Sequence, residues 1–108
     1  MGDATKRTDA IRLASFVSER LDTLDGFVDI IGISGWSDIL DITDEMWDSQ
    51  FDLGLRHAYL ASQELGRLLV DHGGTMVFVA SVSGLTGAPM HAAYGAAKAA
   101  LMLSLIHI

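Results

Sequence analysis

The sequence predicts an α/β fold in which helices cover both faces of a parallel sheet. Two short apolar runs, at residues 27–33 and 75–80, have the length and composition of strands that are buried on both faces. Stretches with the apolar spacing of helices precede, separate and follow these runs. An order of helix, strand, helix, strand and helix favours right-handed crossovers between parallel strands.

The first helix is expected from Ala4 to about Asp22. Its apolar residues recur at helical spacing and predict one buried stripe, formed by Ala10, Leu13, Ala14, Val17 and Leu21. Gly26 ends this unit. The run Phe27–Ile33, interrupted only by Asp29, then predicts the first strand.

A long helix is expected after a loop at residues 34–42. Thr43 suits the N-cap position of this helix, which is predicted to continue to about Asp71. Leu53 and Leu60 are expected on its exposed side, where they would suit an interface. One apolar face is predicted, made of Trp47, Phe51, Leu55, Ala58, Leu65 and Leu69.

The second strand is expected at Thr75–Ala80, and a loop with two glycines and the only proline follows it at residues 81–91. An alanine-rich helix is predicted from His91 to about Ile108. Ligands of parallel sheets bind beyond the carboxyl ends of the strands. Any chemistry should therefore lie in the loops that follow Ile33 and Ala80.

Composition excludes several classes of function. The chain has 108 residues, enough for one small domain, and 14 acidic against 7 basic residues, which disfavours nucleic acid and anionic membranes as partners. The absence of cysteine excludes disulfides and thiolate metal sites, and the four histidines lack ligand-like spacing. Neither a signal peptide nor a long apolar span is evident, so a cytoplasmic protein is expected.

Three residues could carry proton-transfer chemistry. Tyr94 and Lys98 are four positions apart, which places both side chains on one face of the last helix. A neighbouring cation favours the phenolate form of a tyrosine, so the pair suits a general acid/base. Ser81 closes the second strand, and its hydroxyl could hydrogen-bond a substrate carbonyl. A tyrosine and a lysine at this spacing are often only a solvated surface pair, and the context of strand, serine and glycine-rich loop favours the catalytic interpretation.

The stretch from Thr75 through Ser81 and Pro89 to Tyr94-Gly-Ala-Ala-Lys98 resembles the active-site region of short-chain dehydrogenases/reductases. Ser81 precedes Tyr94 by thirteen positions, as in that family, whereas Ser83 lies two positions too late. The resemblance implies a Rossmann-like doubly wound parallel sheet and NAD or NADP as cofactor. It implies that Tyr94 is the acid/base, that Lys98 also binds the nicotinamide ribose, and that Ser81 orients an alcohol or ketone substrate.

Upstream segments extend the resemblance. Residues 24–33 are similar to the strand that ends in the family's Asn-Asn-Ala-Gly motif, of which only Gly32 is kept. The resemblance implies cofactor contacts for Asp29 and Ile31 in this segment, and for Asp3 and Ala4 near the adenine ring. Residues 47–55 resemble the helix that usually carries a catalytic asparagine.

Gly54 stands at the position of that asparagine. Three interpretations are open at this point: the glycine admits a water molecule, allows close helix packing, or is simply a tolerated helix residue. The first would keep a proton relay possible, and the other two leave the relay in doubt.

The resemblance covers residues 2–102, but the family's glycine-rich phosphate-binding loop is not in the sequence. Residues 1–108 are therefore expected to be the middle part of a longer dehydrogenase domain that forms homodimers or homotetramers. The alternative is a truncated remnant or interaction module that binds no cofactor. The last six residues, 103–108, match the translated end of a DNA-library adapter and are expected to be either a non-native tail or an ordinary apolar helix end.

Overall fold

The computed structural model describes residues 1–106, which form two compact units built from alternating parts of the chain. The first unit contains Met1–Ile30 and His57–Val79, and the second contains Ile31–Arg56 and the chain from Ala80 onward. The elements of the first unit are, in chain order, helix α1 (Arg7–Arg20), strand β1 (Gly26–Asp29), helix α3 (His57–Glu64), the 3-10 helix η2 (Gly66–Leu68) and strand β2 (Thr75–Phe78).

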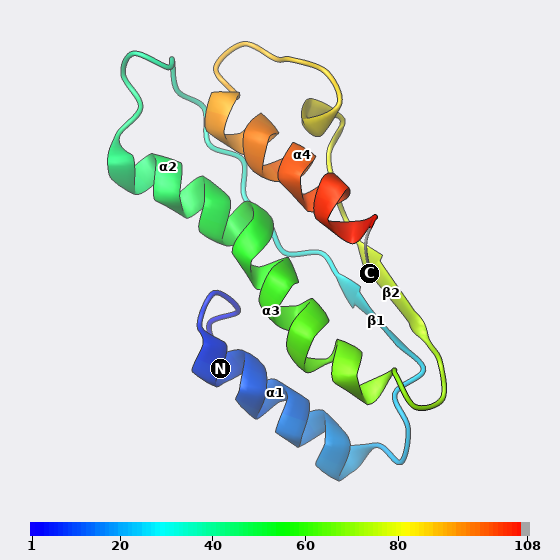
Figure 1. The fold of residues 1–108 in the computed structure, drawn as a ribbon. Helices are drawn as coiled ribbons and strands as arrows, with labels where there is room; N and C mark the ends of the chain where they lie inside the picture. The colour runs from blue at the N-terminus through cyan, green and yellow to red at the C-terminus, as the bar shows by residue number, and fades with distance from the viewer. Residues whose placement is uncertain (107–108) are drawn as a thin grey trace. The chain divides into compact units, whose positions relative to one another are not determined.

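Strands β1 and β2 run parallel, with Val28 opposite Val77, as Figure 1 shows. This pairing confirms the prediction of an α/β fold with a parallel sheet. The first strand is shorter than predicted, because it ends at Asp29 and not at Ile33. At this end of the sheet, the Val79 N–H donates a hydrogen bond to the Asp29 carbonyl oxygen at 2.9 Å.

The predicted burial of both strands is wrong. Val28 is 64% exposed and Val77 46% exposed. The sheet of the described residues has only two strands, so each strand has one unpaired edge. The apolar runs were read correctly as strands, but their side chains lack the second layer of cover that a larger parallel sheet would give.

Helices α1 and α3 pack together in the core of the first unit (Figure 1). Arg7 joins them through an ion pair with Glu64 at 2.9 Å and a hydrogen bond to the hydroxyl of Tyr59. Leu60 is completely buried, so its predicted place on an exposed interface is wrong. The stripe predicted along α1 is also largely wrong, since Ala10 is its only buried residue and Leu13 is 49% exposed.

The second unit contains helix α2 (Asp44–Phe51), the π-helical turn η1 (Asp52–Arg56), the 3-10 helix η3 (Val82–Gly84) and helix α4 (Ala92–Leu105). Helices α2 and α4 lie side by side (Figure 1). Thr43 caps α2 as predicted, because its Oγ1 accepts a hydrogen bond from the backbone N–H of Met46 at 3.1 Å.

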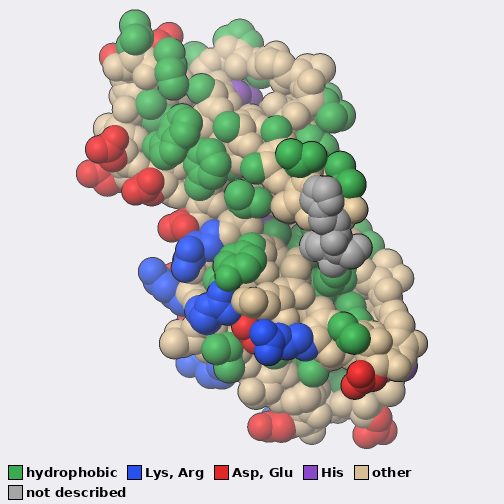
Figure 2. Space-filling model, viewed as in Figure 1, with side chains coloured by type: hydrophobic (Ala, Val, Ile, Leu, Met, Phe, Trp, Pro, Cys, Tyr) green, Lys and Arg blue, Asp and Glu red, His purple; other side chains and the backbone are tan. Residues whose placement is uncertain are grey.

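The single helix predicted from 43 to 71 is instead divided by the π turn, and its regular part ends at Glu64. The buried residues of α2 and η1 are Gln50 and Gly54. Trp47, a member of the predicted apolar face, is 39% exposed, and 5.2 Å separate the centroids of its ring and the Phe51 ring. Acidic side chains, including those of the first turn of α2, lie beside hydrophobic ones in this part of the surface (Figure 2).

Helix α4 begins one residue after its predicted start, and residues 103–105 continue it as regular helix. Residues 107 and 108 lie outside the described residues, so the origin of the 103–108 segment stays an open expectation. Within residues 1–106, none of the helices has the length and apolar character needed to cross a membrane.

Candidate active site

Tyr94 and Lys98 lie one turn apart on α4, in the second unit, as their spacing predicts. Tyr94 is half-buried, whereas Lys98 is 3% exposed. A lysine is rarely buried to this extent, because removing an ammonium group from water is costly unless polar groups receive it. The burial of Lys98 therefore distinguishes this pair from the solvated surface pair that the sequence left open.

The 3-10 helix η3, which follows Ser81 directly, packs closely against α4. A Cβ added to Gly95 would lie 2.8 Å from the Ser83 carbonyl oxygen, and one added to Gly84 would lie 2.8 Å from the Lys98 carbonyl carbon. Side chains at either position would force the two segments apart. Glycines thus hold the turn after Ser81 against the stretch of α4 that carries Tyr94 and Lys98.

The backbone of Ser81 is extended, and its Oγ accepts a hydrogen bond from the Ser83 N–H at 3.2 Å. A hydroxyl has one hydrogen to donate as well as two acceptor sites. The bond to Ser83 uses an acceptor site of the Ser81 oxygen, so the hydrogen of the hydroxyl is not used by this bond.

The backbone at Ile31 and Gly32 passes close to the buried amine. A Cβ on Gly32 would lie 3.1 Å from Lys98 Nζ, so the glycine lets the chain approach the amine where a side chain would crowd it. Ile31 is 37% exposed next to this point. Lys98 and Tyr94 thus lie on α4 beside a stretch of backbone that carries no side chain at Gly32.

Asp3 and Ala4 lie in the first unit, before α1, where Asp3 is exposed. The Asp3 carboxylate accepts hydrogen bonds from the Thr5 hydroxyl at 2.7 Å and from the Thr5 N–H at 2.9 Å. These bonds hold the pKa of Asp3 below its ordinary value. The carboxylate of Asp3 therefore stabilises the turn between Asp3 and Thr5. Its contact with adenine stays a prediction.

Asp29, the other predicted cofactor residue of the first unit, is buried and lies 2.8 Å from His57. The atoms involved are Asp29 Oδ2 and His57 Nδ1. Because an ionised carboxylate only accepts, the Nδ1–H of His57 donates this bond. Nε2 of His57 is buried without a hydrogen-bond partner among the described residues. This pair could not be predicted from the sequence, because 28 positions separate the two residues and no local pattern connects them.

Gly54, at the position of the family's asparagine, packs against α4. A Cβ on Gly54 would lie 2.9 Å from the Cβ of Ala97. Of the three interpretations of this glycine, the geometry favours close helix packing. A side chain of any kind at position 54 would begin in contact with α4.

His91 is a further residue that sequence reasoning undervalued. It directly precedes α4 and is 9% exposed, with serine hydroxyls near both ring nitrogens. Trp36 is 61% exposed, and its ring packs on His91. Only the position of His91 three residues before Tyr94 could have indicated its place.

Known proteins match this chain over most of its length. The family profile described as enoyl-(acyl carrier protein) reductase matches residues 1–106. The chain is 35% identical over 101 residues to 2-(S)-hydroxypropyl-CoM dehydrogenase 3 of Xanthobacter autotrophicus, covering 93% of the chain and 40% of that protein. It is 36% identical over 83 residues to the cyclopentanol dehydrogenase of Comamonas sp., covering 76% of the chain and 33% of that protein.

The crystal structure of a short chain dehydrogenase from Mycobacterium smegmatis superposes with a TM-score of 0.89 and 33% identity. The match covers 94% of this chain and 43% of that structure. The chain thus spans well under half the length of the proteins it matches.

Proposed function

This chain belongs to the short-chain dehydrogenase/reductase family, and on that basis we propose that it carries the catalytic residues of an NAD(P)-dependent oxidoreductase that interconverts an alcohol and a ketone. The relatives named above are dehydrogenases by name, one acting on a CoM-linked alcohol and one on cyclopentanol. Because the chain spans about 40% of the first of them, we assign the activity to a longer enzyme that contains this sequence.

One observation carries the proposal more than any other. The turn after Ser81 lies against α4 at Gly95 and Lys98, at distances that only glycines at 84 and 95 permit. The three residues singled out by their sequence context and by the family resemblance therefore lie on segments in direct contact. A chance Tyr-x-x-x-Lys pair on a solvated helix would not explain the buried lysine or this packing.

In the proposed reaction, the substrate carbonyl oxygen accepts a hydrogen bond from Ser81 and a proton from the Tyr94 hydroxyl. A bound nicotinamide cofactor supplies the hydride in the direction of reduction and accepts it in the direction of oxidation. The buried Lys98 ammonium stabilises the phenolate that remains on Tyr94, which solvent then reprotonates. The products of reduction are the alcohol and the oxidised cofactor, so one hydride and one proton are transferred in each cycle.

The cofactor contacts are proposed for each unit by itself. In the second unit, Ile31, Tyr94 and Lys98 would hold the nicotinamide and its ribose. For the first unit, the resemblance to the family suggests contacts of Asp3, Ala4 and Asp29 with the adenosine part of the cofactor. Asp29 is already engaged by His57, so we expect its contribution to be the support of the strand end more than a direct contact.

The experiment that tests this function replaces Tyr94 by Phe in the longer enzyme. Loss of a positioned general acid typically costs about 100- to 10,000-fold in rate, and we expect kcat to fall by that factor. NAD(P)H affinity, measured by calorimetry, should stay nearly unchanged because the ring is kept. The matched control is Tyr59→Phe, since Tyr59 is the other tyrosine of the chain and its hydroxyl contacts Arg7 on the surface. Full activity of the Tyr94→Phe variant would remove Tyr94 from its assigned role.

The alternative function, an interaction module that binds no cofactor, is favoured by the exposure of the two-stranded sheet. Val28 of β1 and Val77 of β2 are 64% and 46% exposed, and exposed apolar strands at the edge of a sheet invite association with other strands. Because its sequence also lacks the family's glycine-rich phosphate-binding loop, we expect that the 108-residue chain alone does not bind NADH. Saturable NADH binding at micromolar affinity in a calorimetric titration would overturn that expectation.

We also propose that the longer enzyme is a homodimer or homotetramer that acts in the cytoplasm. Trp47 and Phe51 form an aromatic pair on the surface of α2, and Leu103 on α4 is 63% exposed. Light scattering coupled to size-exclusion chromatography measures the oligomeric state directly. A monomer would contradict this part of the proposal.

A further inference from the structure

His91 connects two loops of the second unit that lie far apart in the sequence. Its Nε2 lies 3.3 Å from Ser34 Oγ, and its Nδ1 lies 3.4 Å from Ser83 Oγ. Ser34 belongs to the segment that follows β1, and Ser83 belongs to η3. The buried imidazole therefore has a hydroxyl partner on each side, which fixes the plane of the ring.

A backbone contact joins the same two loops. The Ser37 N–H donates to the Met90 carbonyl oxygen at 2.9 Å, and Ser37 forms an isolated parallel bridge with His91. Met90 has a φ angle of 61°, a left-handed conformation that non-glycine residues rarely adopt. Such a conformation persists where the surroundings hold it, often at a binding or catalytic site.

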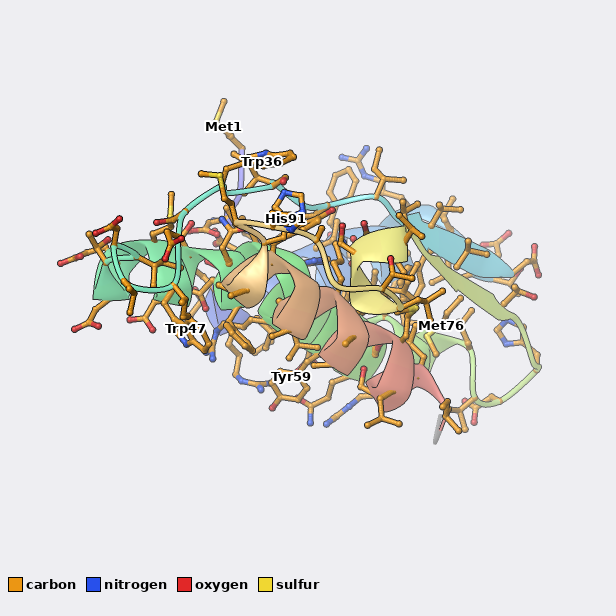
Figure 3. All side chains as sticks on the ribbon, turned by 90° about the horizontal axis from the view of Figure 1, so that it is seen from above. Met1, Trp36, Trp47, Tyr59, Met76 and His91 are labelled. Atoms are coloured by element: carbon orange, nitrogen blue, oxygen red, sulfur yellow. The ribbon has the colours of Figure 1, made fainter. Side chains whose placement is uncertain are left out.

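The connection places an aromatic surface beside the catalytic tyrosine. The Trp36 ring packs on His91 with 3.8 Å between centroids, and the Tyr94 ring lies at the edge of His91 at 5.3 Å. Figure 3 shows the side chains of Trp36 and His91 next to each other. Three rings from two loops and one helix thus form a row that begins at the proposed acid/base.

Trp36 occupies the outer end of this row with much of its indole uncovered. It is 61% exposed, although an indole offers one of the largest apolar surfaces of any side chain. An aromatic ring that is fixed by its neighbours and exposed on the remaining surface can stack against the flat face of another ring. Met90 lies in the loop before α4, where its backbone is bonded to Ser37. It is 51% exposed and adds a second apolar group.

The charged residues of the second unit indicate whether a substrate that stacks on Trp36 should itself be charged. Its described residues include two cations, Arg56 and Lys98, and the first lies 3.9 Å from Asp52 Oδ1. Lys98 is buried. The local potential is therefore unfavourable for substrates with a phosphate or carboxylate tail and indifferent to neutral ones. This potential results from the excess of acidic residues, because the same unit has six carboxylates, at Asp38, Asp41, Asp44, Glu45, Asp48 and Asp52.

We propose that Trp36 determines substrate specificity by stacking on the flat ring of an uncharged aryl or fused-ring ketone whose carbonyl faces Tyr94. His91 is the positioning residue that holds the indole in place. This inference rests on the proposed function, because it concerns the substrate of the same site. It names the class of substrate that the catalytic residues alone leave open.

The test compares two neutral ketones with the same number of carbon atoms, 1-tetralone and 2-decanone, in the longer enzyme. Trp36→Leu should lower kcat/KM for 1-tetralone by about 3- to 10-fold through KM, the range expected for the loss of one ring contact. Its kcat/KM for 2-decanone should change by less than about 2-fold, because an alkyl chain gains as much from leucine as from indole. Trp36→Phe should restore most of the preference for 1-tetralone. The control Trp47→Phe replaces the other tryptophan of the chain by a ring that can still pack on Phe51, and it should leave both values unchanged.

The role of His91 is tested through its dependence on Trp36. His91→Ala should raise KM for 1-tetralone with little change in kcat, and it should have no further effect on the ring preference once Trp36 is leucine. A purely structural loss would lower kcat for both ketones and would add to the effect of Trp36→Leu. Additive effects in this double-mutant cycle would overturn the positioning role.

The two proposals fail in different ways. If the enzyme reduces ketones but Trp36→Leu lowers both kcat/KM values equally, or neither, the specificity inference is wrong and the proposed function stands. If neither ketone is reduced, the stacking site is measured directly by quenching of tryptophan fluorescence with 1-tetralone. Quenching that Trp36→Leu removes and Trp47→Phe keeps supports the site, and equal quenching in both variants overturns it.

Discussion

Replacing Gly54 by Ala tests the close contact between η1 and α4 in the second unit. The new Cβ would lie 2.9 Å from the Cβ of Ala97, whereas two such carbons are comfortable at about 3.5–4.0 Å. Both carbons are attached directly to helical backbone, so neither can rotate away. Overpacking of this kind typically costs about 1–3 kcal/mol, while alanine gains about 1 kcal/mol over glycine in helix propensity. The free energy of unfolding should therefore fall by about 1 kcal/mol.

The decisive observation is whether Gly54→Ala raises or lowers the free energy of unfolding in a protein that also carries Ala97→Gly. With Ala97→Gly the opposing Cβ is gone, so Gly54→Ala should then raise the free energy of unfolding by about 1 kcal/mol from propensity alone. The two measurements differ by a coupling energy of about 2 kcal/mol, within the range seen for residues in contact. Urea denaturation of the four proteins, followed by circular dichroism, gives each value from the midpoint and slope.

A control substitution uses a helical glycine with room around it. A Cβ on Gly66 would have Met76 Sδ at 3.7 Å as its nearest neighbour, an ordinary contact. Gly66→Ala should therefore be neutral or mildly stabilising in both backgrounds. If Gly54→Ala has the same sign with and without Ala97, the packing argument is refuted, and the interpretation of Gly54 as space for a water molecule regains support.

The buried pair of Asp29 and His57 predicts that Asp29→Ala lowers the free energy of unfolding by about 1–3 kcal/mol, because Nδ1 loses its acceptor inside the protein. Asp29→Asn keeps an acceptor and should cost less, and equal losses for the two variants would contradict the hydrogen-bond explanation. Thr5→Val should raise the pKa of Asp3 toward its ordinary value, because the hydroxyl bond is lost. A lowered folded-state pKa adds stability above the unfolded-state pKa and loses it as pH falls through the folded-state value. The acid dependence that Asp3 contributes should thus weaken in Thr5→Val, and an NMR titration of the Asp3 carboxyl that is identical in both proteins would exclude this cause.

The sequence was informative where local patterns decide structure. The apolar runs predicted both strands and their parallel pairing, Thr43 predicted the start of α2, and the spacing of Tyr94 and Lys98 predicted their shared place on α4. Each of these depends on residues within a few positions of one another, or on the general rule for alternating helices and strands.

Burial was predicted less well, because it depends on what covers each face. Leu60 was expected to be exposed and is fully buried, whereas Val28 was expected to be buried and is 64% exposed. The π turn at Asp52–Arg56 was also missed, and Gly54, its buried residue, was singled out only because the resemblance marked its position. Periodicity assumes an unbroken helix and cannot anticipate such a turn.

The contacts around His91 were inaccessible to sequence reasoning for a different reason. Ser34 and His91 are 57 positions apart, and serine and histidine at that separation form no recognisable pattern. Only the family resemblance, through the thirteen positions between Ser81 and Tyr94, identified part of this region in advance.

The contact between the Ser34 hydroxyl and the His91 imidazole has a consequence for how the protein folds. Closing a segment of 57 residues costs about 3–4 kcal/mol of chain entropy, more than the single long contact between Ser34 and His91 and the backbone bond from Ser37 to Met90 return. This contact can therefore form only after the helices and the strand between Ser34 and His91 have formed and brought the two residues closer together. The indole of Trp36 should acquire its native fluorescence late in refolding, after the helical signal has recovered, and the substrate surface would be the last part of the molecule to mature.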